Sequence, residues 1–129
     1  MSYHEHTDYK HARNLRAGAP EAVKAFMELD KQVLRNPDNV IPPKYAELMA
    51  VAVALTTQCA YCIEVHTKAA HEVGATEKEI AETTMIAAAL RAGGAYAHGF
   101  MAMKFFNQAE AAKRPSHLAG LATGRGRDR

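Results

Sequence analysis

Hydrophobic residues recur along the chain at helical spacing and divide it into five predicted helices. From Pro20, apolar residues return every three or four positions as far as Leu34, and the Asn36-Pro37-Asp38-Asn39 stretch ends that pattern. The Gly93-Gly94 pair is expected to break the chain between the last two helices. The four helices after the first are predicted at about 44–57, 59–74, 76–92 and 95–113.

The second predicted helix carries the most apolar run of the chain. Met49 to Leu55 contains no polar residue, which is typical of a helix buried on all sides. A buried strand is the alternative, because Val51 and Val53 alternate with alanines. The length of the run and its alanine content favour a helix.

Local signals at the helix ends support this division. Gly74 is a natural C-terminal cap for the third helix, and Thr76 followed by Glu79 is a capping-box pattern at the start of the fourth. Glu64 and Lys68 are spaced to form an ion pair on the solvent face of the third helix.

The pattern predicts an all-α fold, a compact bundle of about five to six helices. We expect a polar leader at residues 1–19, a helical domain at 20–114 and a disordered basic tail at 115–129. The leader contains spaced histidines that we expect to be solvated: His4, His6 and His11.

Composition and charge indicate one globular domain in the cytoplasm. The chain is 48% hydrophobic and 23% charged, has no apolar run of the roughly 18–20 residues that span a membrane, and begins with a polar stretch unlike a signal peptide. Its net charge of +2 arises in the tail, since residues 1–113 hold twelve basic and thirteen acidic side chains. The near-neutral helical part therefore gives no reason to expect nucleic-acid binding. Six methionines and the Phe105-Phe106 pair favour a homo-oligomer that covers apolar surface.

Both cysteines and one histidine lie at the start of the third predicted helix. Cys59, Cys62 and His66 are separated by three and four positions, which places them on one helix face. A thiolate is stabilised at a helix N-terminus, and the spacing of the two thiols allows a disulfide. His66 could accept a thiol proton, and Glu47 of the preceding apolar helix is the carboxylate placed to orient its imidazole.

Other interpretations of these residues stay open. Cys59, Cys62, His66 and Glu47 could be zinc ligands, although structural zinc sites usually present a second ligand pair at similar spacing. The cysteines and the histidine could also be ordinary buried residues. A thioredoxin-type fold is rejected, because the cysteine pair would then follow a strand and here it follows an apolar helix. In the cytoplasm a close cysteine pair is more often catalytic or metal-binding than structural.

Glu47, then eleven residues, then Cys59-Ala60-Tyr61-Cys62, then three residues and His66, resembles the signature of the alkylhydroperoxidase D-like group within the carboxymuconolactone decarboxylase superfamily. The resemblance covers roughly residues 20–110 and is specific at 44–74. It implies a helical fold that assembles into homo-oligomers, often trimers or hexamers, and a peroxidase activity. Members of this group can carry a histidine between the cysteines, where this chain has Tyr61.

The resemblance also implies a role for each residue. Cys62 would be the thiol that attacks the peroxide and becomes sulfenic acid, Cys59 would resolve it into a disulfide and donate a proton, and Glu47 with His66 would relay protons. An external dithiol or a lipoylated protein would reduce the disulfide. We expect no tightly bound cofactor, since no glycine-rich dinucleotide motif is present. A redox-switched regulatory or disulfide-exchange module without peroxidase turnover is the alternative function.

Overall fold

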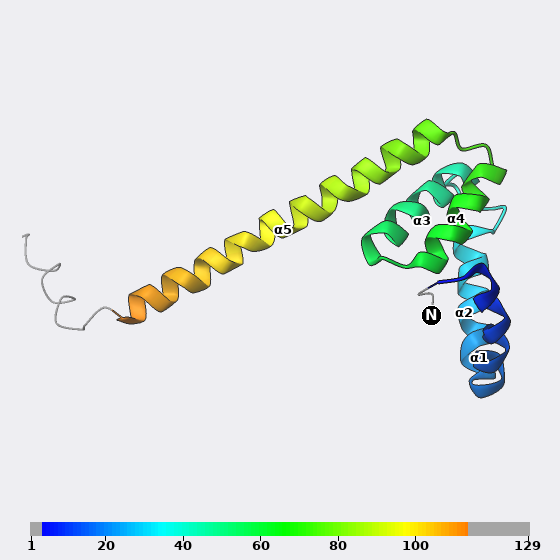
Figure 1. Ribbon diagram of the computed structural model, residues 1–129, viewed down its shortest axis with the longest axis horizontal. Coiled ribbons are helices and arrows are strands. Elements are labelled where there is room, and N and C mark those ends of the chain that lie inside the picture. Colours follow the sequence, from blue (N-terminus) through cyan, green and yellow to red (C-terminus); the bar gives the residue numbers. More distant parts are fainter. Residues whose placement is uncertain (1–3, 114–129) are drawn as a thin grey trace, which may run out of the picture. The chain divides into compact units, whose positions relative to one another are not determined.

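The structure is a computed structural model that describes residues 4–113, and every regular element in that range is a helix. The all-α prediction is therefore confirmed for this part of the chain, whereas the tail predicted to be disordered lies outside the described residues. The 3-10 helix and the five α-helices shown in Figure 1 are η1 (His6–His11), α1 (Ala12–Gly18), α2 (Pro20–Leu34), α3 (Pro43–Thr57), α4 (Ala60–Glu72) and α5 (Glu77–Lys113).

Several helix ends follow the local signals in the sequence. Pro20 and Pro43 occupy the first positions of α2 and α3, where a missing backbone N–H breaks no helical hydrogen bond. Gly74, at φ 87°, follows the end of α4 in a conformation that favours glycine. The capping box is present: the Thr76 N–H donates to Glu79 Oε2 over 2.8 Å, and the Glu79 N–H donates to Thr76 Oγ1 over 3.2 Å.

The break predicted at Gly93-Gly94 is wrong, because α5 continues through both glycines. Each glycine weakens a helix interior by about 1 kcal/mol relative to alanine. The glycines keep their backbone N–H groups, however, and the neighbouring Leu90, Arg91 and Ala92 are good helix formers. Glycine therefore lowers the stability of this helix without ending it, as a proline would.

The core lies where α3 packs against α4, which is the most extensive helix pairing in the structure. Val51 and Ala54 of α3 and Ala70 of α4 are almost completely buried, and the small alanine side chains let the two backbones approach closely. Contacts divide the chain into two units after Arg91. The core and the predicted site residues belong to the first unit, and residues 92–113 of α5 belong to the second.

The unit formed by residues 4–91 does not bury α3 on all sides, contrary to the expectation from its apolar run. Met49 and Val53 remain 47% and 59% exposed. The run is nevertheless helical, which excludes the strand alternative. None of the helices within residues 4–113 combines the length and apolar character needed to cross a membrane.

Candidate active site

A tight turn between α3 and α4 delivers Cys59 to the start of α4. Gln58 adopts a left-handed conformation with φ 58° and ψ 37°, and the backbone N–H groups of Gln58 and Cys59 both donate to the carbonyl of Ala54. Cys59 is the N-cap residue of α4, and its Sγ accepts a hydrogen bond from the Cys62 N–H over 3.3 Å. After reduction, the same N–H and the helix dipole would stabilise negative charge on the sulfur.

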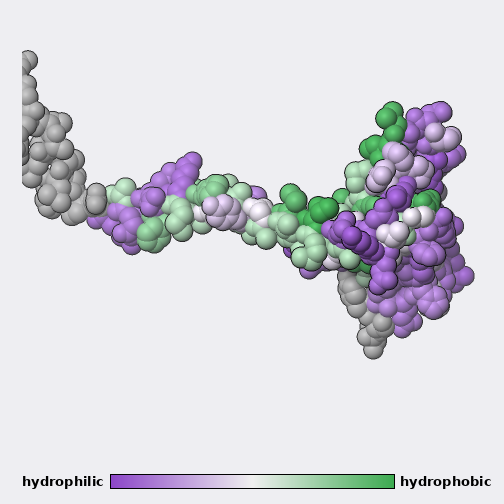
Figure 2. Space-filling model, turned by 90° about the horizontal axis from the view of Figure 1, so that it is seen from above, coloured by the Kyte–Doolittle hydropathy of each residue, from purple (hydrophilic) through white to green (hydrophobic). Residues whose placement is uncertain are grey.

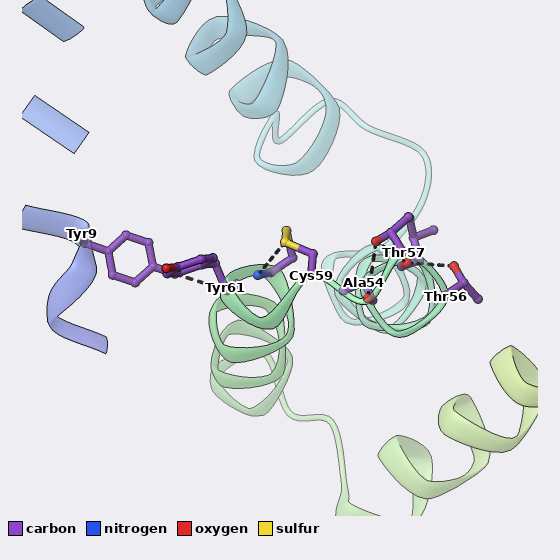
Figure 3. Close-up of a disulfide and its surroundings, with 8 residues drawn as sticks. Tyr9, Ala54, Thr56, Thr57, Cys59 and Tyr61 are labelled. Carbon is purple, nitrogen blue, oxygen red and sulfur yellow. Dashed lines mark hydrogen bonds between the residues drawn. A yellow bond between two sulfur atoms is a disulfide. The ribbon is translucent and has the colours of Figure 1, made fainter. Parts of the chain in front are cut away.

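Cys59 and Cys62 are joined by a disulfide across the first turn of α4 (Figure 3). Their Cα atoms are 5.3 Å apart, within the range usual for disulfides. The two sulfurs can therefore meet without a rearrangement of the helix.

His66 is held by a carboxylate from the neighbouring helix. Its Nδ1 lies 2.8 Å from Oε2 of Glu47, which projects from α3 and is only 4% exposed. His66 is itself half-buried and stands four residues beyond Cys62, on the same face of α4. With Nδ1 occupied by Glu47, Nε2 is the ring nitrogen left to exchange a proton with another group.

An apolar cavity of about 660 Å³ lies beside Cys62 and His66. The cavity has two further polar lining residues, Asn39 and Thr57, and both donate hydrogen bonds to backbone carbonyls. The Asn39 amide donates to the carbonyls of Gln32 and Val33, and the Thr57 hydroxyl donates to the carbonyl of Val53. Cys62 and His66 thus lie in a wall that is otherwise mainly apolar. The apolar part of the wall is formed by Val33, Leu34, Val40, Ile41, Ala46, Met49, Ala50, Val53 and Ala54.

The N-terminal segment binds the first turn of α4 through Tyr61, the residue next to Cys62. The Tyr9 hydroxyl donates to the Tyr61 carbonyl over 3.2 Å, and the Tyr61 hydroxyl donates to Asp8 over 2.8 Å. Figure 3 shows Tyr61 directed toward Tyr9. The backbone N–H of Glu5, followed by the Tyr61 hydroxyl, lowers the pKa of Asp8.

A second contact of this segment corrects two expectations from the sequence. His4 is not solvated, because its Nε2 lies 2.7 Å from Oε2 of Glu64. The predicted Glu64–Lys68 pair is confirmed, but Glu64 also contacts His4 and is therefore partly buried instead of lying on an open solvent face. Lys68, followed by His4, lowers the pKa of Glu64 by hydrogen bonding to its charged form.

The four predicted site residues thus come from two packed helices: Glu47 from α3, and Cys59, Cys62 and His66 at and after the start of α4. Their catalytic roles stay a prediction. The sequence analysis missed the contacts of Tyr61 and the apolar walls of the cavity. The sequence did contain one indication of these walls: Val40 and Ile41 are apolar residues in a loop, where polar residues are more usual, and both line the cavity. Within the described range 4–113, no three His, Cys, Asp or Glu side chains are arranged to hold a metal ion.

Comparison with known proteins identifies relatives of this arrangement. Residues 20–105 match the carboxymuconolactone decarboxylase family. A protein of the cox locus of Paracoccus denitrificans, itself described as uncharacterized, is 42% identical over 97 residues, which is 75% of this chain and 85% of that protein.

Two solved structures share the fold at 28% identity. A carboxymuconolactone decarboxylase family protein from Legionella pneumophila, solved in its apo form, superposes with a TM-score of 0.58 over 64% of this chain and 71% of its own. A protein from Methanobacterium thermoautotrophicum superposes with a TM-score of 0.57 over 78% of this chain and 99% of its own.

Proposed function

Because the chain belongs to the carboxymuconolactone decarboxylase family, we propose that it is a thiol-dependent peroxidase of the alkylhydroperoxidase D-like kind. The observation that carries this proposal is the pairing of Cys62 and His66 in the wall of one apolar cavity, with His66 bonded to Glu47. Cys59, which does not line the cavity, stands one helical turn away as the second thiol.

In the first step, the reduced Cys62 attacks an oxygen of the hydroperoxide as a thiolate. An S–O bond forms while the O–O bond breaks, so the sulfur loses two electrons and becomes sulfenic acid. His66 accepts the proton of the Cys62 thiol and returns it to the leaving alkoxide, which departs as an alcohol. Glu47 orients the imidazole and offsets the positive charge that it carries between the two proton transfers.

In the second step, Cys59 attacks the sulfenic sulfur of Cys62. An S–S bond forms, the S–O bond breaks and water leaves, which gives the disulfide seen in the structure. An external dithiol then reduces the disulfide by two exchange reactions and is itself oxidised. The family resemblance makes a lipoylated protein the proposed donor.

The cavity favours an organic hydroperoxide over hydrogen peroxide. None of its lining residues is Lys, Arg, Asp or Glu, so an apolar substituent meets mainly apolar side chains away from the reacting Cys62 and His66. Burial of roughly 100 Å² of such a substituent, at about 25 cal/mol per Å², contributes about 2.5 kcal/mol. We therefore expect kcat/KM for cumene hydroperoxide to exceed that for hydrogen peroxide by between tenfold and a hundredfold, on the order of that energy.

The proposal is tested by following peroxide and free thiol together with a dithiol present. Turnover of many peroxides per chain supports the enzyme, whereas one stoichiometric oxidation would instead favour the redox-switched module. Cys62→Ser should abolish sulfenic acid formation, and Cys59→Ser should leave sulfenic acid that can be trapped at Cys62. His66→Asn should lower turnover, while His71→Asn, an exposed histidine at the end of the same helix, serves as the matched control.

A further inference from the structure

We propose that α5 of a second copy of this chain covers the cavity beside Cys62, so that the working site is assembled from two copies. This inference goes beyond the activity proposed above, and only its turnover measurement rests on that activity. It is carried by four properties of the described residues: an open cavity wall, an apolar and uncharged helix segment, glycines with free space beside them, and the exposed aromatic area of α5.

The cavity wall is open in the unit that residues 4–91 form. Val40 is 97% exposed, and Ile41, Met49 and Val53 are each about half exposed, although all four line the cavity. Ligand pockets usually bury most of the surface of their ligand and exclude water from the reacting groups. A substrate at Cys62 would therefore remain partly in water unless something covers this wall.

The segment from Ala92 to Met103 in α5 is suited to cover such a wall. It contains no Lys, Arg, Asp or Glu, and the cavity lining contains none either. Tyr96 and Phe100 lie one turn apart in it with their rings packed edge to face, and Tyr96 is 74% exposed. Figure 2 shows hydrophobic residues along the exposed surface of this helix. An apolar helix lying in an apolar groove is a common mode of recognition.

The glycines of α5 point to a close neighbour outside the chain. Gly93, Gly94 and Gly99 lie in the helix interior, where alanine would be more stable. A Cβ built at any of them meets no atom within 4 Å beyond its own helix turn and chain neighbours, so no contact among residues 4–113 requires glycine there. Close approach of another backbone would require it, because glycine alone leaves room for that approach.

The exposed aromatic area of α5 would supply more than half of one partner's share of an interface between two copies. Four aromatic side chains of α5 are more than half exposed and together present roughly 500 Å², given the area that such side chains bury in proteins. Each partner in a standard interface contributes about 800 Å². Because one chain carries both the open groove and the apolar helix, a second copy is the partner that fits both. The four side chains are Tyr96, Phe100, Phe105 and Phe106.

The assembly is tested first, without reference to activity. Sedimentation velocity of the full-length chain at micromolar concentration should show an oligomer that Phe100→Glu converts to monomer. Thr84→Glu adds the same charge at an exposed position of the same helix, outside the segment proposed to form the interface, and should leave the oligomer intact. A Cβ at position 99 meets nothing within 4 Å, and leucine is a better helix former than glycine, yet Gly99→Leu should also dissociate the oligomer. A monomeric wild-type protein overturns the proposal.

Complementation then tests whether the second copy completes the site. Phe100→Glu keeps Cys62 and Cys62→Ser keeps an intact α5, so each variant alone should turn over peroxide at least about tenfold more slowly than wild type. Mixing them after subunit exchange should restore turnover several-fold above the sum of the separate variants. An active Phe100→Glu monomer, or a mixture without gain, overturns the proposal. An inactive wild-type oligomer would contradict the peroxidase function but would leave the interface result standing.

Discussion

Replacing Glu47 by glutamine separates the proposed proton relay from the packing around it. Glutamine has nearly the same shape as glutamate and keeps an oxygen that can accept from Nδ1 of His66, 2.8 Å away in the wild-type chain. It cannot, however, carry the negative charge that stabilises a protonated imidazole. The substitution therefore changes the electrostatics of the pair and leaves its geometry nearly intact.

The expected magnitudes follow from the burial of Glu47. A hydrogen bond to a charged group is worth about 1.5–3 kcal/mol and a neutral one about 0.5–1.5 kcal/mol, so the free energy of unfolding should fall by about 1 kcal/mol. General acid–base catalysis contributes about 10²–10⁴ to rate, and we expect Glu47→Gln to lower kcat by roughly a hundredfold. Turnover should thus fall far more than stability.

The assay combines steady-state turnover of cumene hydroperoxide with urea unfolding of the reduced protein. Glu72→Gln, at an exposed position of α4, is the matched control and should change neither quantity. Turnover of Glu47→Gln within about twofold of wild type would refute the relay. A loss of turnover that merely follows the loss of folded protein would assign Glu47 a structural role instead.

Three further outcomes are expected. Gln58→Gly should raise the free energy of unfolding by about 0.5 kcal/mol, because relief of the left-handed conformation slightly outweighs the added freedom of the unfolded chain; urea unfolding measures it. Thr76→Ala should lower the same quantity by about 1 kcal/mol through loss of the cap. The Asp8–Tyr61 contact should be fully present above the ordinary carboxyl pKa of about 3.9 and weaken as pH falls through the lowered pKa of Asp8. Proteolysis of the N-terminal segment should increase correspondingly at low pH, and Asp8→Asn should remove that pH dependence.

The Glu47–His66 pairing could be predicted because it follows from local rules and simple chemistry. Offsets of three and four residues fix which side chains share a face of α4, and a buried imidazole needs a hydrogen-bond partner. The preceding apolar helix offers one such carboxylate, so the choice was narrow. The same reasoning located the ends of α2 and α3 from their prolines.

The contacts of the N-terminal segment could not be predicted in this way. His4 and Glu64 are 60 residues apart, and a polar pair at that separation produces no periodic pattern in the sequence. Whether such groups meet depends on how η1 docks against α4, which is decided by packing between elements and not by the preferences of either one. The cavity walls escaped notice for the same reason, since Val40 and Ile41 lie in a loop.

The two remaining errors concern the two surfaces that the proposed assembly brings together. The apolar run of α3 predicted burial on all sides, yet the unit formed by residues 4–91 leaves Met49 and Val53 exposed. Gly93-Gly94 predicted a break in α5, yet the helix continues through both. Selection acts on burial and backbone approach in the working molecule, so a pattern that one chain leaves unexplained is evidence for a partner. A second copy whose α5 packs along α3 would explain both observations: it would bury the apolar run of α3, and it would use the glycines of α5 for close backbone approach.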